Sequence, residues 1–281
     1  MSWQQYEEDV FQECQRIFRE TQVIKNTYII RGRYSNVPCQ IDVLVQNYLI
    51  DGTFASIMID AKNYSTKVDV KCVESFIAML DDVNIPKGIL VTNKGFTEAA
   101  INRAHFGTND IEVEILNMDE LGQFQSTVAI PYSGQNGIVL PAPFGWIIDG
   151  KYNGFSPAAL YPRGFSFEEA MYNKEWIYIQ FWDKNDDIST IPMLIENQNQ
   201  ILKLHDPTAN IEIIEQELFI RKARLAKYPT IEITIFKEFE AFILFGVLYC
   251  PDYYIDRDIK KLKYVMQNAI PLHITRPAHR S

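Results

Sequence analysis

The hydrophobic period changes several times along the first 116 residues, and the order of these changes restricts the fold more than any other feature of the chain. Residues 3–20 carry apolar side chains at three- and four-residue spacings, which predicts an amphipathic helix. Segments rich in β-branched and aromatic residues come next and predict strands; they are residues 27–33, 39–46 and 54–63.

After Asp69 the apolar residues return to helical spacing, and this helix is expected to end before Pro86. Residues 88–92 form a short apolar run, Thr97 is suited to cap a helix, and residues 111–116 alternate as a last strand. The sequence therefore predicts the order α-β-β-β-α-β-α-β, which is an α/β domain of three layers with a mixed central sheet.

Glycine and proline are concentrated between Gly122 and Phe144, which marks a boundary in the chain. We therefore predict a first domain at residues 1–125, a linker at residues 126–140 and a second domain at residues 141–281.

The second block mixes aromatic strands with helical segments. The predicted strands are residues 176–182, 231–236 and 241–249, and the predicted helical segments lie near residues 166–173 and 212–226. This mixture predicts an α+β domain. It contains no catalytic motif, and we expect an accessory role in specificity or sensing, with an unidentified ligand or protein partner.

The composition, with 47% hydrophobic and 22% charged residues, is that of a globular chain. The longest apolar stretch, residues 241–249, is about half of the roughly 20 residues that a membrane helix needs. The first residues show neither a basic nor an apolar region of a signal peptide. We therefore expect a cytoplasmic protein without a membrane partner.

The charge balance argues against a general nucleic-acid coat protein, because the net charge is −9. Residues 2–125 hold 11 basic and 18 acidic residues, so any contact with DNA must be local. The four cysteines are Cys14, Cys39, Cys72 and Cys250, and they lack the spacing of a zinc site. We expect reduced thiols.

Two acidic residues lie inside strongly apolar strands. Asp42 follows Gln40 and Ile41 in one strand, and Asp60 ends an apolar run in the next, with Lys62 two residues later. Carboxylates on neighbouring antiparallel strands can converge, and Lys62 shares the face of Asp60. The alternative is that both acids are strand-end residues and that Lys62 simply pairs with one of them.

Two carboxylates about 4 Å apart repel by roughly 4 kcal/mol at an effective dielectric of 20, so the pair needs a cation or a shared proton. Mg²⁺, with Mn²⁺ as a substitute, favours carboxylates, a carbonyl such as that of Ala61, and several waters. Such a metal can activate water against a phosphodiester while Lys62 orients that water. The pattern is typical of a nuclease site.

These segments, together with residues 87–100 (KGILVTNKGFTEAA), resemble the Mrr-type restriction endonuclease domain of the PD-(D/E)XK nuclease superfamily. The resemblance covers roughly residues 2–120. It implies a restriction-endonuclease-like fold, DNA as the substrate, metal binding by Asp42 and Asp60, and a catalytic role for Lys62. Tyr6 and Glu7 match the aromatic-Glu motif of the family's first helix, so the resemblance also suggests Glu7 as an additional acid.

The candidates for DNA contacts are three basic residues and one glutamine near this cluster in sequence, and the two arginines are the strongest of them. Arg31 and Arg33 alternate on one face of a strand, Lys67 follows Lys62, and Gln40 precedes Asp42. The alternatives are an exposed strand face for the arginines and a backbone hydrogen bond for Gln40.

We expect a divalent-metal-dependent endonuclease that cleaves DNA in restriction, defence or DNA processing. A homodimer is expected because cutting both strands requires two sites. A catalytically silent nuclease-like protein that binds DNA or a partner is the alternative, and an RNA or repair-structure nuclease is a third interpretation. No motif specifies sequence or methylation preference.

Overall fold

The chain divides into two compact units, Met1–Phe124 and Gln125–Ser281, in the computed structural model. The residues that the structure describes are 2–19, 22–50, 53–105, 111–133, 136–151, 154–228 and 230–273.

The first unit begins with one helix and then forms a sheet interrupted by helices. Its elements are α1 (Trp3–Ile17), β1 (Gln22–Arg31), β2 (Pro38–Ile50), β3 (Thr53–Lys62), α2 (Val70–Asp82), β4 (Lys87–Thr92), α3 (Glu98–His105), β5 (Glu112–Leu116) and α4 (Met118–Gly122). The order from α1 to β5 agrees with the order predicted from the hydrophobic periods.

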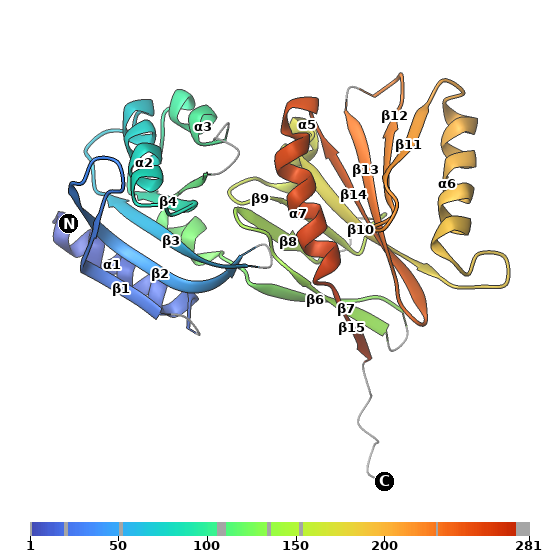
Figure 1. Cartoon of the computed structure of the whole chain (residues 1–281), viewed down its shortest axis with the longest axis horizontal. Coiled ribbons are helices and arrows are strands. Elements are labelled where there is room, and N and C mark those ends of the chain that lie inside the picture. Colours follow the sequence, from blue (N-terminus) through green and yellow to red (C-terminus); the bar gives the residue numbers. More distant parts are fainter. Residues whose placement is uncertain are drawn as a thin grey trace, which may run out of the picture. The chain divides into compact units, whose positions relative to one another are not determined.

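The five strands form one sheet in the order β1-β2-β3-β4-β5. Strand β2 pairs antiparallel with β1 and β3, whereas β4 pairs parallel with β3 and β5, so the sheet is mixed. Figure 1 shows α1 on one side of this sheet and α2 and α3 on the other. Parallel pairing brings the carboxyl ends of β3 and β4 to the same edge.

Close packing on the α2 face requires a small residue in β4. Leu44, Met58 and Leu90 contribute to the core that α2 and α3 cover. A Cβ atom on Gly88 would lie 2.5 Å from Leu80 Cδ1 and 2.6 Å from Phe76 Cε1. The glycine therefore allows α2 to approach the sheet closely.

The second unit consists largely of antiparallel strands. Its elements are β6 (Thr127–Pro131), β7 (Asn136–Pro141), β8 (Trp146–Asp149), β9 (Ala158–Pro162), α5 (Phe167–Asn173), β10 (Trp176–Asp183), α6 (Ile191–His205), β11 (Asn210–Glu215), β12 (Ile220–Arg224), β13 (Ile231–Glu238), β14 (Phe242–Cys250), a 3-10 turn (Asp252–Tyr254), α7 (Ile255–Gln267) and β15 (Ile270–His273). A seven-stranded sheet has the order β11-β12-β13-β14-β10-β9-β8, and a three-stranded sheet has the order β15-β7-β6.

Two sequence predictions for this region need correction. Most of residues 126–140, predicted as a linker, belongs to the hairpin of β6 and β7, whose prolines Pro131 and Pro141 each end a strand. Proline is compatible with a strand end, so its presence did not exclude strands.

Residues 212–226, predicted as helical, fall largely in the antiparallel strands β11 and β12. The turn between them, residues 216–219, contains no Gly, Pro, Asn or Asp, and Phe219 adopts a positive φ of 48° there. The usual turn signal was therefore missing from the sequence. Helices α6 and α7 were also missed.

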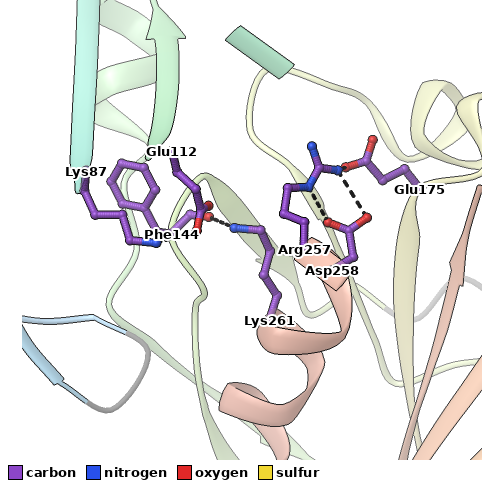
Figure 2. A network of polar contacts seen from close by, with 7 residues as sticks. All are labelled: Lys87, Glu112, Phe144, Glu175, Arg257, Asp258 and Lys261. Carbon is purple, nitrogen blue, oxygen red and sulfur yellow. Dashed lines mark hydrogen bonds and ion pairs between the residues drawn. The ribbon is translucent and has the colours of Figure 1, made fainter. Parts of the chain in front are cut away.

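A largely buried network of polar contacts joins α7 to other parts of the second unit (Figure 2). Arg257 Nη2 lies 2.5 Å from Glu175 Oε1, and Arg257 Nε lies 2.7 Å from Asp258 Oδ1. Lys261 Nζ donates to the Phe144 carbonyl at 2.8 Å. Asp258 is fully buried, and its ion pair with Arg257 offsets the cost of placing its charge in the interior.

We expect Gly88→Ala to destabilise the first unit by about 1–3 kcal/mol, because the added methyl group overlaps Leu80 and Phe76. Gly122→Ala is the matched control, since its Cβ would meet only the ends of two flexible side chains, Glu13 at 3.0 Å and Arg16 at 3.6 Å. Denaturant unfolding of both variants checks this, and equal losses would contradict the packing argument.

Candidate active site

The proposed site lies where β2 separates from β3. The β2–β3 ladder has Val43 opposite Ile59 as its last pair on this side, whereas β3 continues beside β4 as far as Lys62. Asp42 Oδ2 accepts a hydrogen bond from the Ala61 backbone N–H at 2.9 Å. A carboxylate thus takes the place of a ladder carbonyl at this point, which fixes Asp42 against the end of β3.

Asp42 and Asp60 meet at this position, as the sequence analysis expected. Burial raises the pKa of Asp42 to about 7, and its hydrogen bond with Asp60, the negative charge of Asp60 and the charge of Glu7 add to the rise. The Ala61 N–H opposes it. In the absence of a cation, the Asp42 carboxyl therefore retains a proton up to about neutral pH.

Lys62 is the cation of this cluster. Its Nζ atom lies 2.7 Å from Asp60 Oδ2, and only 12% of the Asp60 side chain is exposed. Burial disfavours the charge on Lys62, but the attraction and hydrogen bond of Asp60 outweigh this effect, so the Lys62 pKa is raised. The lysine is thus protonated at neutral pH.

The two neighbouring acids of α1 have different surroundings. Glu7 lies close enough to Asp42 for its charge to raise the Asp42 pKa. Glu8 instead forms an ion pair with Lys25 and accepts a hydrogen bond from Gln12 at 2.7 Å. The fold thus directs Glu7 toward the cluster and gives Glu8 a structural partner.

The side chains at this position offer two carboxylates to a metal ion. Among the described residues, no group of three or more His, Cys, Asp or Glu side chains could hold a metal ion. Asp42 and Asp60 nevertheless offer two carboxylates joined by a hydrogen bond. Two carboxylates with a carbonyl and several waters fit Mg²⁺, which is usually bound through only one or two carboxylates.

Both arginines suggested as DNA contacts have partners within the protein. Arg31 ends β1, but Arg33 lies beyond it in the turn before β2, so the two do not share a strand face as predicted. Arg33 donates to Asp81 Oδ1 and Asn84 Oδ1, each at 2.8 Å, and Arg31 donates to the Asn36 carbonyl at 2.7 Å. Asp82 accepts hydrogen bonds from the backbone N–H groups of Tyr34 and Ser35. Any DNA contact by Arg33 would have to compete with these partners.

The other two suggested DNA contacts lie elsewhere. Gln40 lies in β2, two residues before Asp42 and on the exposed part of the strand. Lys67 is exposed in the loop after β3. The Val68 N–H donates to the Gly95 carbonyl, which places this loop beside the loop after β4, where Lys94 is also exposed.

The sequence analysis missed residues that surround the end of β3. Thr92 Oγ1 donates to the Lys62 carbonyl at 2.9 Å, and Asn93 contacts both Asn63 and Tyr64. The Tyr64 hydroxyl is hydrogen-bonded to the Cys72 thiol beside Lys62. The sequence signal for Thr92 and Asn93 is the segment KGILVTNKGFT, residues 87–97. This segment carries the family resemblance, but the sequence alone suggested no role for its polar residues.

Within the described residues, the structure has no helix that is long and apolar enough to cross a membrane.

Comparisons with known proteins match the first unit to one family. The family model described as "Restriction endonuclease" (Mrr_cat) matches residues 2–124. A search of curated proteins gave no match.

Two solved structures show only weak likeness to the chain. Cyanobacterial PsbP (CyanoP) from Synechocystis sp. PCC 6803 is 12% identical, with a TM-score of 0.32, 52% of this chain covered and 93% of that one. LpqN of Mycobacterium tuberculosis, described as involved in cell envelope biogenesis, is 10% identical, with a TM-score of 0.36, 52% of this chain covered and 90% of that one. Neither TM-score is high enough to assign a fold.

The family match covers the helix that carries Glu7, the strands that carry Asp42, Asp60 and Lys62, and the segment that contains Thr92. The first unit of this chain is therefore an Mrr-type restriction endonuclease domain.

Proposed function

We propose that the first unit hydrolyses phosphodiester bonds of DNA with the help of a divalent metal ion. The observation that carries the proposal is the meeting of Asp42, Asp60 and Lys62 at the point where β2 leaves β3. Buried carboxylates that share a proton are costly in a purely structural role, and perturbed groups of this kind cluster at functional sites.

Asp42, Asp60 and the Ala61 carbonyl would hold the ion, which we take to be Mg²⁺ with Mn²⁺ as a substitute. When bound, the ion supplies Lewis acidity toward a phosphodiester and lowers the pKa of a coordinated water. Asp42 must give up its proton for the ion to enter, since its carboxylate is the ligand. Asp60 holds the Lys62 ammonium group at 2.7 Å.

Lys62 would orient the attacking water and offset the negative charge that develops on the phosphate. The raised pKa of Lys62 suits this role, because the side chain stays charged at the pH of the reaction. We assign Glu7 a supporting role through its charge, which acts on Asp42.

DNA would approach the edge of the sheet at the carboxyl ends of β3 and β4. Lys67 and Lys94 are exposed on the two loops that pair there. Basic residues near the site help an acidic unit bind a polyanion, because they place positive charge only where phosphates must lie. Arg31, Arg33 and Gln40 are secondary candidates for contacts.

The second unit would select or license the target, and a homodimer would supply the two sites needed to cut both strands. We place the reaction in restriction, defence or DNA processing. The place of the reaction rests on the family of the first unit, whereas the role of the second unit does not follow from that family.

We expect cleavage of plasmid DNA to require Mg²⁺ or Mn²⁺, and Lys62→Ala and Asp60→Asn to lower its rate by about 100-fold or more. Methylated and unmethylated plasmids should be compared, with circular dichroism as the check of folding. Folded wild-type protein that binds DNA but never cuts it would favour the catalytically silent alternative.

A matched pair of variants tests the position of Glu7. Glu7→Gln should slow cleavage by about tenfold, because the negative charge of Glu7, which is close enough to act on Asp42, also attracts the divalent ion to the site. Glu8→Gln removes a neighbouring charge that pairs with Lys25, so its rate should stay near that of the wild type. Initial rates of plasmid nicking check this, and equal effects of the two substitutions would exclude a specific role for Glu7.

The raised Asp42 pKa also has a consequence for stability. The folded, metal-free protein binds a proton that the unfolded chain releases near pH 3.8, so stability is lost as the pH rises toward about 7. Asp42→Asn removes this loss. We expect its melting temperature to exceed that of the wild type by several degrees at pH 8 and by little at pH 4.5.

Scanning calorimetry of the full chain in the presence of a chelator measures this difference. Asp119→Asn, which changes an exposed carboxylate of α4, is the control and should show no such dependence on pH. A difference for Asp42→Asn that does not change with pH would contradict the assignment of the proton to the Asp42–Asp60 pair.

The DNA surface can be tested by the salt dependence of binding. Lys67→Gln combined with Lys94→Gln should reduce the slope of log affinity against log salt by about two, since each lysine releases about one counterion. Arg33→Gln should change the slope little, because Arg33 pairs with Asp81. Fluorescence anisotropy in chelator checks this, and the reverse order of effects would place the DNA on the β1–β2 hairpin.

A further inference from the structure

We infer that Thr92 is a positioning residue for Lys62, and that its hydroxyl group, supported by Asn93, holds the end of β3 in its active geometry. The inference rests on the proposed function of the site. It gives a role to Thr92 and Asn93, the polar residues at the end of β4.

The need for such a support follows from the sheet. Beyond the pair of Val43 and Ile59, β3 is held by β4 on one side, while β2 no longer pairs with it through a backbone ladder. This part of β3 carries Asp60 and Lys62, and on the β2 side its Ala61 N–H is bonded by the Asp42 carboxyl instead of by a ladder carbonyl. A strand end with one ladder is held less firmly than one with two, and a displacement of about 1 Å at a catalytic group can cost about 100-fold in rate.

Thr92 lies directly opposite Lys62 in the β3–β4 register. Its hydroxyl donates to the Lys62 carbonyl at 2.9 Å and accepts from the Lys94 N–H at 3.3 Å. The side chain is 0% exposed, so water does not compete for these bonds. One hydroxyl thus joins the ends of the two strands where the ladder finishes.

Asn93 continues this link along the next residues. Its Oδ1 atom accepts from the Tyr64 N–H at 3.2 Å, and its Nδ2 atom donates to Asn63 Oδ1 at 2.7 Å. The chain immediately after Lys62 is therefore tied to the β4 end by side chains. Thr92 and Asn93 together form what we call the strand clasp.

The clasp explains why threonine suits position 92. Valine has nearly the same shape but lacks the hydroxyl, and its burial there would leave the Lys62 carbonyl and the Lys94 N–H without this partner. Serine keeps the hydroxyl and loses only a methyl group. The two substitutions separate the hydrogen bonds of Thr92 from its packing.

We expect Thr92→Val in the full chain to lower kcat for plasmid cleavage by about tenfold or more, with KM within about twofold of the wild type. Thr92→Ser should recover kcat to within about threefold. Thr97→Val is the control, because the Thr97 hydroxyl caps α3 by accepting the Ala100 N–H at 3.3 Å and does not contact Lys62. Its kcat should stay near the wild-type value.

Amide hydrogen exchange provides a readout that does not depend on activity. Thr92→Val should speed exchange in the peptide that covers residues 60–66, and Thr97→Val should not. Wild-type kcat in Thr92→Val, an equal loss in Thr92→Ser, or unchanged exchange at residues 60–66 would each overturn the inference. A wild-type protein that never cleaves would instead refute the proposed function, and exchange would still decide whether the clasp holds β3.

Discussion

The separation of β2 from β3 after the pair of Val43 and Ile59 is the constraint on which the candidate site depends. A continuous ladder would give the Ala61 N–H a backbone acceptor. Because the ladder stops, the Asp42 carboxylate accepts that N–H, and it is held beside Asp60 in the interior of the sheet. The same break deprives the end of β3 of one neighbour, which makes the contacts of Thr92 and Asn93 necessary for placing Lys62.

The electrostatics of the unit follow from this arrangement. An apolar sheet surrounds the two carboxyls, so their interaction with each other and with Lys62 is stronger than it would be in water. The pair needs either a proton or a cation. Because the Asp42 pKa is about 7, a cation can replace the proton near physiological pH. The excess of acidic residues in this unit is compatible with DNA binding because exposed lysines lie on the loops beside the site.

Much of the first unit could be predicted from the sequence, because its periods are long and its turns carry ordinary signals. The position of Asp42 and Asp60 within apolar strands also predicted their meeting. The pairing of Arg33 with Asp81 could not be predicted, since it joins residues 48 positions apart through a tertiary contact. Thr92 was missed because a buried threonine in a strand looks like core, and only the register with Lys62 reveals its hydrogen bond. In the second unit, the turn at Phe219 lacked the usual residues, so two strands were read as a helix.

Calorimetric titration of Mn²⁺ into the full chain near pH 6, in two buffers of different ionisation heat, tests the central claim most directly. Mn²⁺ must displace the proton that the Asp42–Asp60 pair shares, so we expect one site per chain and the release of about one proton on binding. Asp42→Asn should bind more weakly and release none. Absence of binding, or binding whose proton release is the same in Asp42→Asn, would contradict the account.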